Sequence, residues 1–189
     1  MGEKSDGIVH PLVARILASV SEERLESYRP EGGSDDDMLA NYLWNLALSE
    51  ALYPSLQAVE VTLRNRICTG GLVVHGTSLW FCEDAIFQLT SHEVDAYQAA
   101  VARLQDRGKP VTAGRIIAEL RFGFWVSLFN KPHNAYWKQA GSQMLKQIFP
   151  HAPKRFRARY QIQPRLARVR DLRNRVFHHE PRQAAEPSG

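Results

Sequence analysis

Cysteine is scarce in this chain, which has only Cys68 and Cys82 among its 189 residues. The two do not form a C-x-x-C motif, so the sequence offers no thioredoxin-like redox pair. The simplest interpretation is that both are small buried side chains of a protein that stays in a reducing cytoplasm.

Long apolar runs are also absent, and no stretch would span a bilayer. The amino-terminal stretch MGEKSDGIVHPLV lacks the extended apolar core of a signal peptide. It matches a myristoylation site only in part, because Asp6 stands where serine or threonine is required. The sequence therefore predicts no membrane partner.

Familiar catalytic and cofactor motifs are missing as well. The chain has no G-x-S-x-G elbow, no Walker loop and no G-x-G-x-x-G fingerprint. His178 and His179 are adjacent, and they would point in different directions on a helix. The other histidines are too scattered for a zinc site: His10, His75, His92, His133 and His151. No metal and no cofactor is expected.

What the chain does have is the composition of an ordinary globular protein, with 44% hydrophobic and 23% charged residues. Its length suits one domain with a real core, which we place at residues 1–182. The last residues, 183–189, are expected to form a disordered tail.

Positive charge is concentrated near the carboxyl end. Residues 154–182 hold ten lysines and arginines against Asp171 and Glu180, a net charge of +8, so the rest of the chain carries −4. A segment rich in arginine favours a polyanion partner, because the guanidinium fork suits phosphate. The alternative is a solvated basic helix face. The arginines expected to bind such a polyanion are Arg165, Arg168, Arg170 and Arg175.

Almost every segment has the apolar spacing of a helix, which predicts an all-α fold. Pro54 interrupts the long periodic stretch 38–67 and predicts a kink or two abutting helices. Gly70, Gly71 and Gly76 predict a break, with room for a short strand at 72–75. The other expected helices are 11–28, 90–107, 112–130, 135–149, 154–160 and 164–178.

Several side chains have expected places in these elements. Ser34 with Asp37, and Thr90 with Glu93, have the spacing of helix caps. Pro164 suits the first turn of the last helix. The four tryptophans are expected in the core rather than as platforms for nucleobases: Trp44, Trp80, Trp125 and Trp137.

The last helix carries a charge on its apolar face. Advancing about 100° per residue places Arg173 between Val169 and Phe177 on that face. Such an arginine must find a carboxylate or lie at an interface, because an isolated buried charge is costly. Asn174 and His178 are four residues apart and share a neighbouring stripe.

An earlier helix has a matching anomaly. Glu60 lies at the edge of an apolar face near Ile67, and Glu50 lies similarly one segment before. One interpretation is a structural ion pair of Glu60 with Arg64 or with Arg173. The other is a polar site built where the two helices meet.

The stretch from Arg173 to His178 fits R-N-x-x-x-H, the signature of HEPN-domain ribonucleases. The surrounding LRNRVFHHEP resembles the carboxyl-terminal motif of the Abi-like (abortive infection) proteins, a HEPN subgroup. Two upstream segments, YLWNLALSEALYPSLQAVEVTLRNRI and AGRIIAELRFGFWVSLF, are similar to the same subgroup. The resemblance covers most of residues 38–181.

This resemblance implies a HEPN-like helical bundle, a homodimer and metal-independent RNA cleavage in phage defence or as a toxin. A toxin in turn implies a cognate antitoxin as partner. In this interpretation Arg173, Asn174 and His178 are catalytic, and Glu60, Arg64 and His179 support them. Histidine titrates near neutral pH and suits an acid or base, while an arginine suits the negative charge of a phosphorane.

One geometric difficulty accompanies the assignment. On an ideal helix Arg173 and His178 are about 140° apart. They converge only if the helix ends near His178, as Pro181 allows, or if a second protomer completes the site. The alternative function is a non-catalytic RNA-binding or protein-interaction module, and a third is a structural dimer with a vestigial motif. The RNA target and the trigger are not specified by the sequence.

Overall fold

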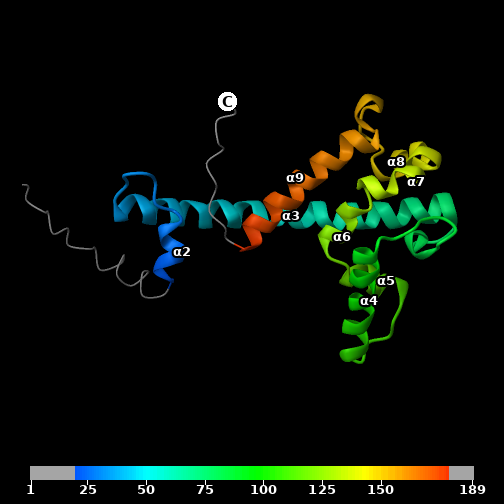
Figure 1. The fold of residues 1–189 in the computed structure, drawn as a ribbon, viewed down its shortest axis with the longest axis horizontal. Coiled ribbons are helices and arrows are strands. Elements are labelled where there is room, and N and C mark those ends of the chain that lie inside the picture. Colours follow the sequence, from blue (N-terminus) through cyan, green and yellow to red (C-terminus); the bar gives the residue numbers. More distant parts are fainter. Residues whose placement is uncertain (1–19, 179–189) are drawn as a thin grey trace, which may run out of the picture. The chain divides into compact units, whose positions relative to one another are not determined.

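A computed structural model describes residues 20–178, and within that range all regular structure is helical, with no strand. The expectation of an all-α fold is therefore confirmed. No helix among the described residues is long and apolar enough to cross a membrane. The α-helices, labelled as in Figure 1, are α2 (Glu22–Glu26), α3 (Asp35–His75), α4 (Ser91–Asp106), α5 (Ala113–Glu119), α6 (Phe122–Ser127), α7 (Asn134–Gln139), α8 (Gly141–Ile148) and α9 (Arg159–His178).

The chain divides into two compact units, and α3 and α9 contribute residues to both. The smaller unit comprises residues 1–54 and 174–189, and the larger comprises residues 55–173. Three short 3-10 helices also belong to the larger unit: η1 (Trp80–Cys82), η2 (Lys131–His133) and η3 (Lys154–Phe156).

In the smaller unit, α2 packs against the start of α3 through Leu25, Tyr28 and Met38. Arg29 fixes the loop between the two helices with ion pairs to Glu26 and Asp35, each 2.6 Å long. The part of the expected helix 11–28 that precedes residue 20 lies outside the described residues.

The start of α3 is capped as its sequence predicts. The Ser34 amide donates to Asp37 Oδ2 at 2.9 Å, and the Asp37 amide donates to Ser34 Oγ at 3.2 Å. These bonds satisfy amides that a helix leaves without an intrahelical acceptor. They confirm the predicted cap, which could be read from the sequence because its two residues are only three positions apart.

The helix α3 is continuous over 41 residues, with Pro54 inside it. Of the two alternatives expected at this proline, two abutting helices is wrong, whereas a kink stays a prediction. Proline costs a helix interior about 3 kcal/mol. The helix nevertheless continues past the proline, and Leu56 is buried two residues after it.

The core of the larger unit is formed by α3 from Leu63 onward and by the helices that follow it. Trp80, Phe81, Trp125 and Phe129 are completely buried in it. The expected burial of the tryptophans is confirmed for Trp80, Trp125 and Trp137, and it is wrong for Trp44 in the smaller unit, which is 70% exposed. Cys68 is buried and Cys82 partly buried, both as free thiols, and burial raises the pKa of Cys68 to about 12.

The expected break at Gly70 and Gly71, with a strand at 72–75, is wrong because α3 extends to His75. Both glycines are buried helical residues that let neighbouring elements approach closely. A Cβ on Gly71 would overlap the Trp80 ring, whose Nε1 donates to the Ile67 carbonyl at 3.2 Å. The helix ends instead at Gly76, whose φ of +78° suits glycine.

Gly71→Ala is expected to destabilise the fold, because the overlap falls on the fixed ring of Trp80. Overpacking typically costs about 1–3 kcal/mol, more than the ~1 kcal/mol gained from the better helix propensity of alanine. Gly123→Ala is the matched control, since Gly123 lies in α6 with no neighbouring atom within 4 Å. Urea unfolding should show opposite signs for the two variants. Equal midpoints would contradict the packing role of Gly71.

Two of the expected helices are each divided in the structure. Residues 113–127 form α5 and α6, with extended backbone at Leu120, where tertiary hydrogen bonds replace helical ones. The Leu120 carbonyl accepts from Trp125 Nε1 at 3.3 Å, and the Glu119 carbonyl accepts from Arg103 Nη2 at 3.1 Å. Residues 134–148 form α7 and α8, which meet where Gly141 packs on Trp137.

The last helix begins earlier than Pro164, which lies inside α9 rather than in its first turn. The buried side chain of Ile162 anchors the turn that precedes this proline. Of the expected helix 154–160, only the 3-10 turn η3 forms before α9 starts at Arg159.

Candidate functional site

Arg173 on α9 and Glu60 on α3 form an ion pair within the larger unit. Arg173 Nε lies 3.3 Å from Glu60 Oε2, and their side chains are 24% and 12% exposed. The charge on the apolar face of α9 thus has a carboxylate opposite it. The expectation of an ion pair is confirmed, with Arg173 rather than Arg64 as the partner of Glu60.

Arg64 lies on α3 one helical turn after Glu60 and has an incomplete set of polar contacts. Its Nη1 donates to the Ala118 carbonyl over 3.5 Å, a long hydrogen bond. Its buried Nε and the buried Glu60 Oε2 have no hydrogen-bond partner among the described residues. Buried polar atoms without such a bond are uncommon and mark a place where function is to be sought.

Glu60→Gln is expected to destabilise the protein by about 1–3 kcal/mol, because the partly buried guanidinium of Arg173 loses its counter-charge. Asp95→Asn, an exposed carboxylate on α4, is the matched control and should change stability little. Urea unfolding at neutral pH measures both. If Glu60→Gln and Asp95→Asn have equal midpoints, the ion pair does not contribute to folding.

The remaining residues of the R-N-x-x-x-H motif are not brought together by any described contact. Asn174 is exposed on α9 and belongs to the smaller unit. His178 is the last residue of α9, but its side chain is not among those described, and His179 lies outside the described residues. Convergence of Arg173, Asn174 and His178 stays a prediction.

The four arginines expected to bind RNA differ in their exposure and in whether an acidic side chain already pairs with them. Arg165, Arg168 and Arg175 are exposed, the last of them in the smaller unit. Arg170 is partly buried and is paired with the adjacent Asp171, whose Oδ1 accepts its Nη2 at 2.8 Å. Arg170 is therefore the weakest of the four candidates.

A second buried polar group was not expected. Glu93 closes the predicted capping box of α4, accepting from the Thr90 amide at 2.8 Å. It also accepts from Ser127 Oγ at 2.6 Å and contacts His133 Nε2 at 2.9 Å. The cap was visible in the sequence, but His133 is 40 residues away from Glu93 and carries no local signal.

This group has the residue types of a catalytic triad without its geometry. The Ser127 hydroxyl donates to Glu93 and to no histidine, so it has no base to activate it. Burial alone would raise the pKa of Glu93, but hydrogen bonds from His133, Ser127 and Thr90 lower it to about 2. The group is a structural link between α4, α6 and η2.

Within residues 20–178, no group of three or more histidine, cysteine or acidic side chains is arranged to hold a metal ion. The fold and these contacts define an all-α protein with a partly buried glutamate–arginine pair joining two of its helices. Comparison with protein-family models, curated proteins and solved structures gives no match. The interpretation of the site therefore depends on the sequence motif and on these contacts.

Proposed function

We propose that this protein is a metal-independent endoribonuclease of the HEPN class, of the Abi-like group, which acts in phage defence or as a toxin. One observation carries the proposal. Arg173 of the R-N-x-x-x-H motif is paired with Glu60, which belongs to another of the segments that resemble this group. An ion pair between these two residues gives the motif arginine a defined position in the larger unit.

The proposed reaction begins with the 2′-hydroxyl of an RNA nucleotide. His178 removes its proton, and the oxygen attacks the adjacent phosphorus while the 5′-oxygen of the next nucleotide leaves and takes a proton from water. Arg173 stabilises the negative charge of the phosphorane, Glu60 orients Arg173, and Asn174 orients His178 or bonds the phosphate. The products are a 2′,3′-cyclic phosphate and a 5′-hydroxyl end.

A homodimer is part of the proposal. Glu60 already compensates the charge of Arg173, so burial of that charge no longer requires a second protomer. The support comes instead from exposed apolar side chains on α3 in the smaller unit, since exposed apolar patches mark association surfaces. They are Leu43, Trp44, Leu46 and Tyr53. Glu50, expected beside a buried face, lies exposed among them.

The proposal also includes a cytoplasmic location, which the two free cysteines support. It further includes a cognate antitoxin that restrains the toxin, because an unrestrained ribonuclease would damage the cell that makes it.

The test is cleavage of a mixed RNA pool in the presence of EDTA. Wild-type protein is expected to cut this RNA and to leave DNA and 2′-O-methyl RNA of the same sequences intact, because both lack the attacking hydroxyl. Mass spectrometry of the products should show cyclic phosphate ends. Cleavage that requires a divalent metal, or that also consumes the 2′-O-methyl strand, would exclude this mechanism.

The contact between Glu60 and Arg173 also fits the alternative, a non-catalytic RNA-binding module in which the pair is structural. The same assay separates the two functions. A non-catalytic module would retain the RNA pool in a filter-binding assay without shortening any strand.

A further inference from the structure

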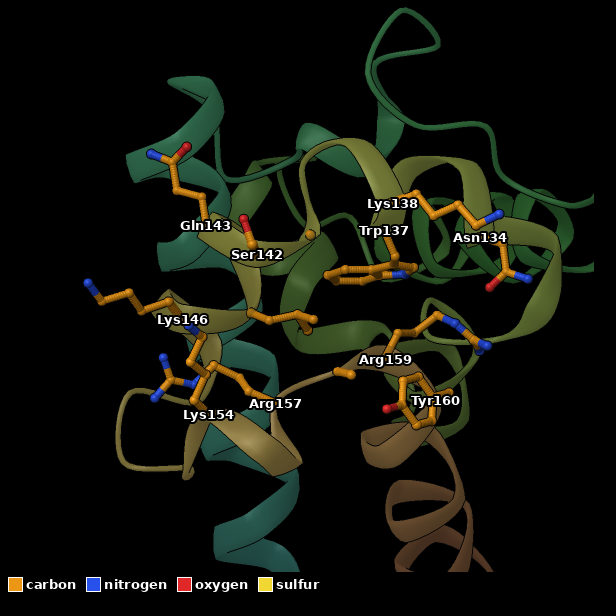
Figure 2. Close-up of a pocket in the computed structure, with 13 residues that line it drawn as sticks. Asn134, Trp137, Lys138, Ser142, Gln143, Lys146, Lys154, Arg157, Arg159 and Tyr160 are labelled. Atoms are coloured by element: carbon orange, nitrogen blue, oxygen red, sulfur yellow. The ribbon is translucent and has the colours of Figure 1, made fainter.

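A pocket of about 980 Å³ lies in the larger unit between α7, α8, η3 and the start of α9. Small-molecule and cofactor sites typically enclose about 300–1,000 Å³. Figure 2 shows Lys146, Lys154 and Arg157 on one side of this pocket. On the other side are Trp137 and Tyr160, with Lys138 and Arg159 beside them.

The charged residues that line this pocket are all basic. Five of its residues are basic, and none of its lining residues is aspartate or glutamate. The surrounding sequence is equally one-sided, because no acidic residue occurs between Glu119 and Asp171. The pocket therefore lies in a strongly positive potential that favours an anion.

The basic side chains divide into fixed and available groups. Arg157 Nε donates to the Ala152 carbonyl at 3.1 Å, and Arg159 Nη1 donates to the Phe129 carbonyl at 2.7 Å. These bonds hold the two arginines in place but leave their charge without a carboxylate. Each remaining cation is exposed, and none is in an ion pair within residues 20–178: Lys138, Lys146 and Lys154.

The same pocket presents aromatic and apolar surface. Tyr160 is 66% exposed, which leaves its ring accessible for stacking. Trp137 is held by a hydrogen bond from its Nε1 to the Leu128 carbonyl at 2.7 Å, so its ring forms a rigid wall. Leu145 and Ala158 complete the apolar part of the lining. A ligand that matches this pocket combines a flat apolar group with negative charge.

We propose that this pocket binds a nucleoside phosphate, with the base against Tyr160 and the phosphate between the lysines and arginines. Bases stack on exposed aromatic side chains, and lysine and arginine recognise phosphate. The nucleotide is either free or one residue of single-stranded RNA. The RNA form depends on the proposed function, whereas the free form does not.

The test compares matched variants that lose the same charge. Lys138→Gln/Lys146→Gln removes two lysines from the pocket, and Lys109→Gln/Lys131→Gln removes two exposed lysines that do not line it. Tyr160→Ala removes the stacking ring. Equal thermal midpoints establish that each variant folds. The probes are AMP, inorganic phosphate and a fluorescein-labelled single-stranded oligonucleotide of 2′-O-methyl RNA, which resists cleavage.

The expected result is a loss of affinity of about tenfold or more in the pocket double variant and clearly less in its control, with a shallower salt dependence for the oligonucleotide. Tyr160→Ala should lose at least about fivefold, because stacking contributes to nucleotide binding but not to phosphate binding. Pocket-dependent binding of AMP but not of the oligonucleotide assigns the pocket to a free nucleotide. Pocket-dependent binding of the oligonucleotide assigns it to RNA.

Equal losses in the two double variants would overturn the proposal, as would failure of both AMP and the oligonucleotide to bind. Binding of inorganic phosphate that Tyr160→Ala leaves unchanged, without preference for AMP, would also overturn it. The cleavage assay separates this proposal from the proposed function. Pocket-dependent binding without cleavage would support the pocket and exclude the ribonuclease. Cleavage by the wild type, together with AMP and oligonucleotide binding that the pocket variants leave unchanged, would support the ribonuclease and exclude the pocket.

Discussion

His178→Ala is expected to lower the rate of RNA cleavage by about 10²–10⁴-fold, the usual contribution of a general acid or base. No other residue in the proposed mechanism can carry the proton of the 2′-hydroxyl near neutral pH. His151→Ala is the matched control, since His151 is exposed and remote from the motif in the sequence. Single-turnover rates on one labelled RNA in EDTA measure both. Equal rates for the two variants would remove His178 from the mechanism.

The arginine of the motif needs a variant that separates chemistry from folding. Arg173→Ala leaves the partly buried carboxylate of Glu60 without its ion-pair partner, so both stability and cleavage should fall. Arg173→Lys keeps the positive charge but loses the planar fork. A lysine variant that is as stable as wild type but cleaves RNA at least about tenfold more slowly would assign the fork to the transition state.

Mixing the two inactive variants tests whether two protomers share a site. If Arg173 of one protomer acts with His178 of its partner, half of the randomly mixed dimers contain one intact site of two. The mixture of Arg173→Ala and His178→Ala should then recover about a quarter of wild-type activity. A mixture as inactive as its parents would place both residues in the site of one protomer. Convergence of the two side chains would then have to occur within one protomer.

Glu93→Ala is expected to have the largest effect on stability, about 3–5 kcal/mol. Glu93 and His133 are both buried, so the substitution leaves His133 and Ser127 without their acceptor and also removes the capping box of α4. Urea unfolding at pH 7 measures the loss. Glu83→Gln, an exposed carboxylate, should change little by comparison.

The pH dependence of this effect has a defined sign. The pKa of Glu93 is lowered from an ordinary value of 4.5 to about 2. Its ionised form therefore stabilises the fold fully above about pH 4.5, and this contribution is lost as the pH falls toward 2. The difference in unfolding free energy between wild type and Glu93→Gln should shrink from pH 5 to pH 3. A constant difference would contradict the lowered pKa.

The sequence by itself determined the features that depend on neighbours within one or two helical turns. The helical class and the two caps, Ser34 with Asp37 and Thr90 with Glu93, follow from such local spacing. The displaced charges of Glu60 and Arg173 were also visible, because each departs from the apolar periodicity of its own helix.

The tertiary structure decided what those local signals leave open. It pairs Glu60 with Arg173, which is 113 residues away in the chain, rather than with Arg64, which is 4 residues away. It also shows that Gly71 lies inside α3, where the absence of a side chain lets the Trp80 ring pack against the helix. It also joined Glu93 to His133, and it grouped lysines of α7 and α8 with arginines near the start of α9 around one pocket. Spacing along one helix carries no information about these contacts, since each joins elements that come together only when the core packs.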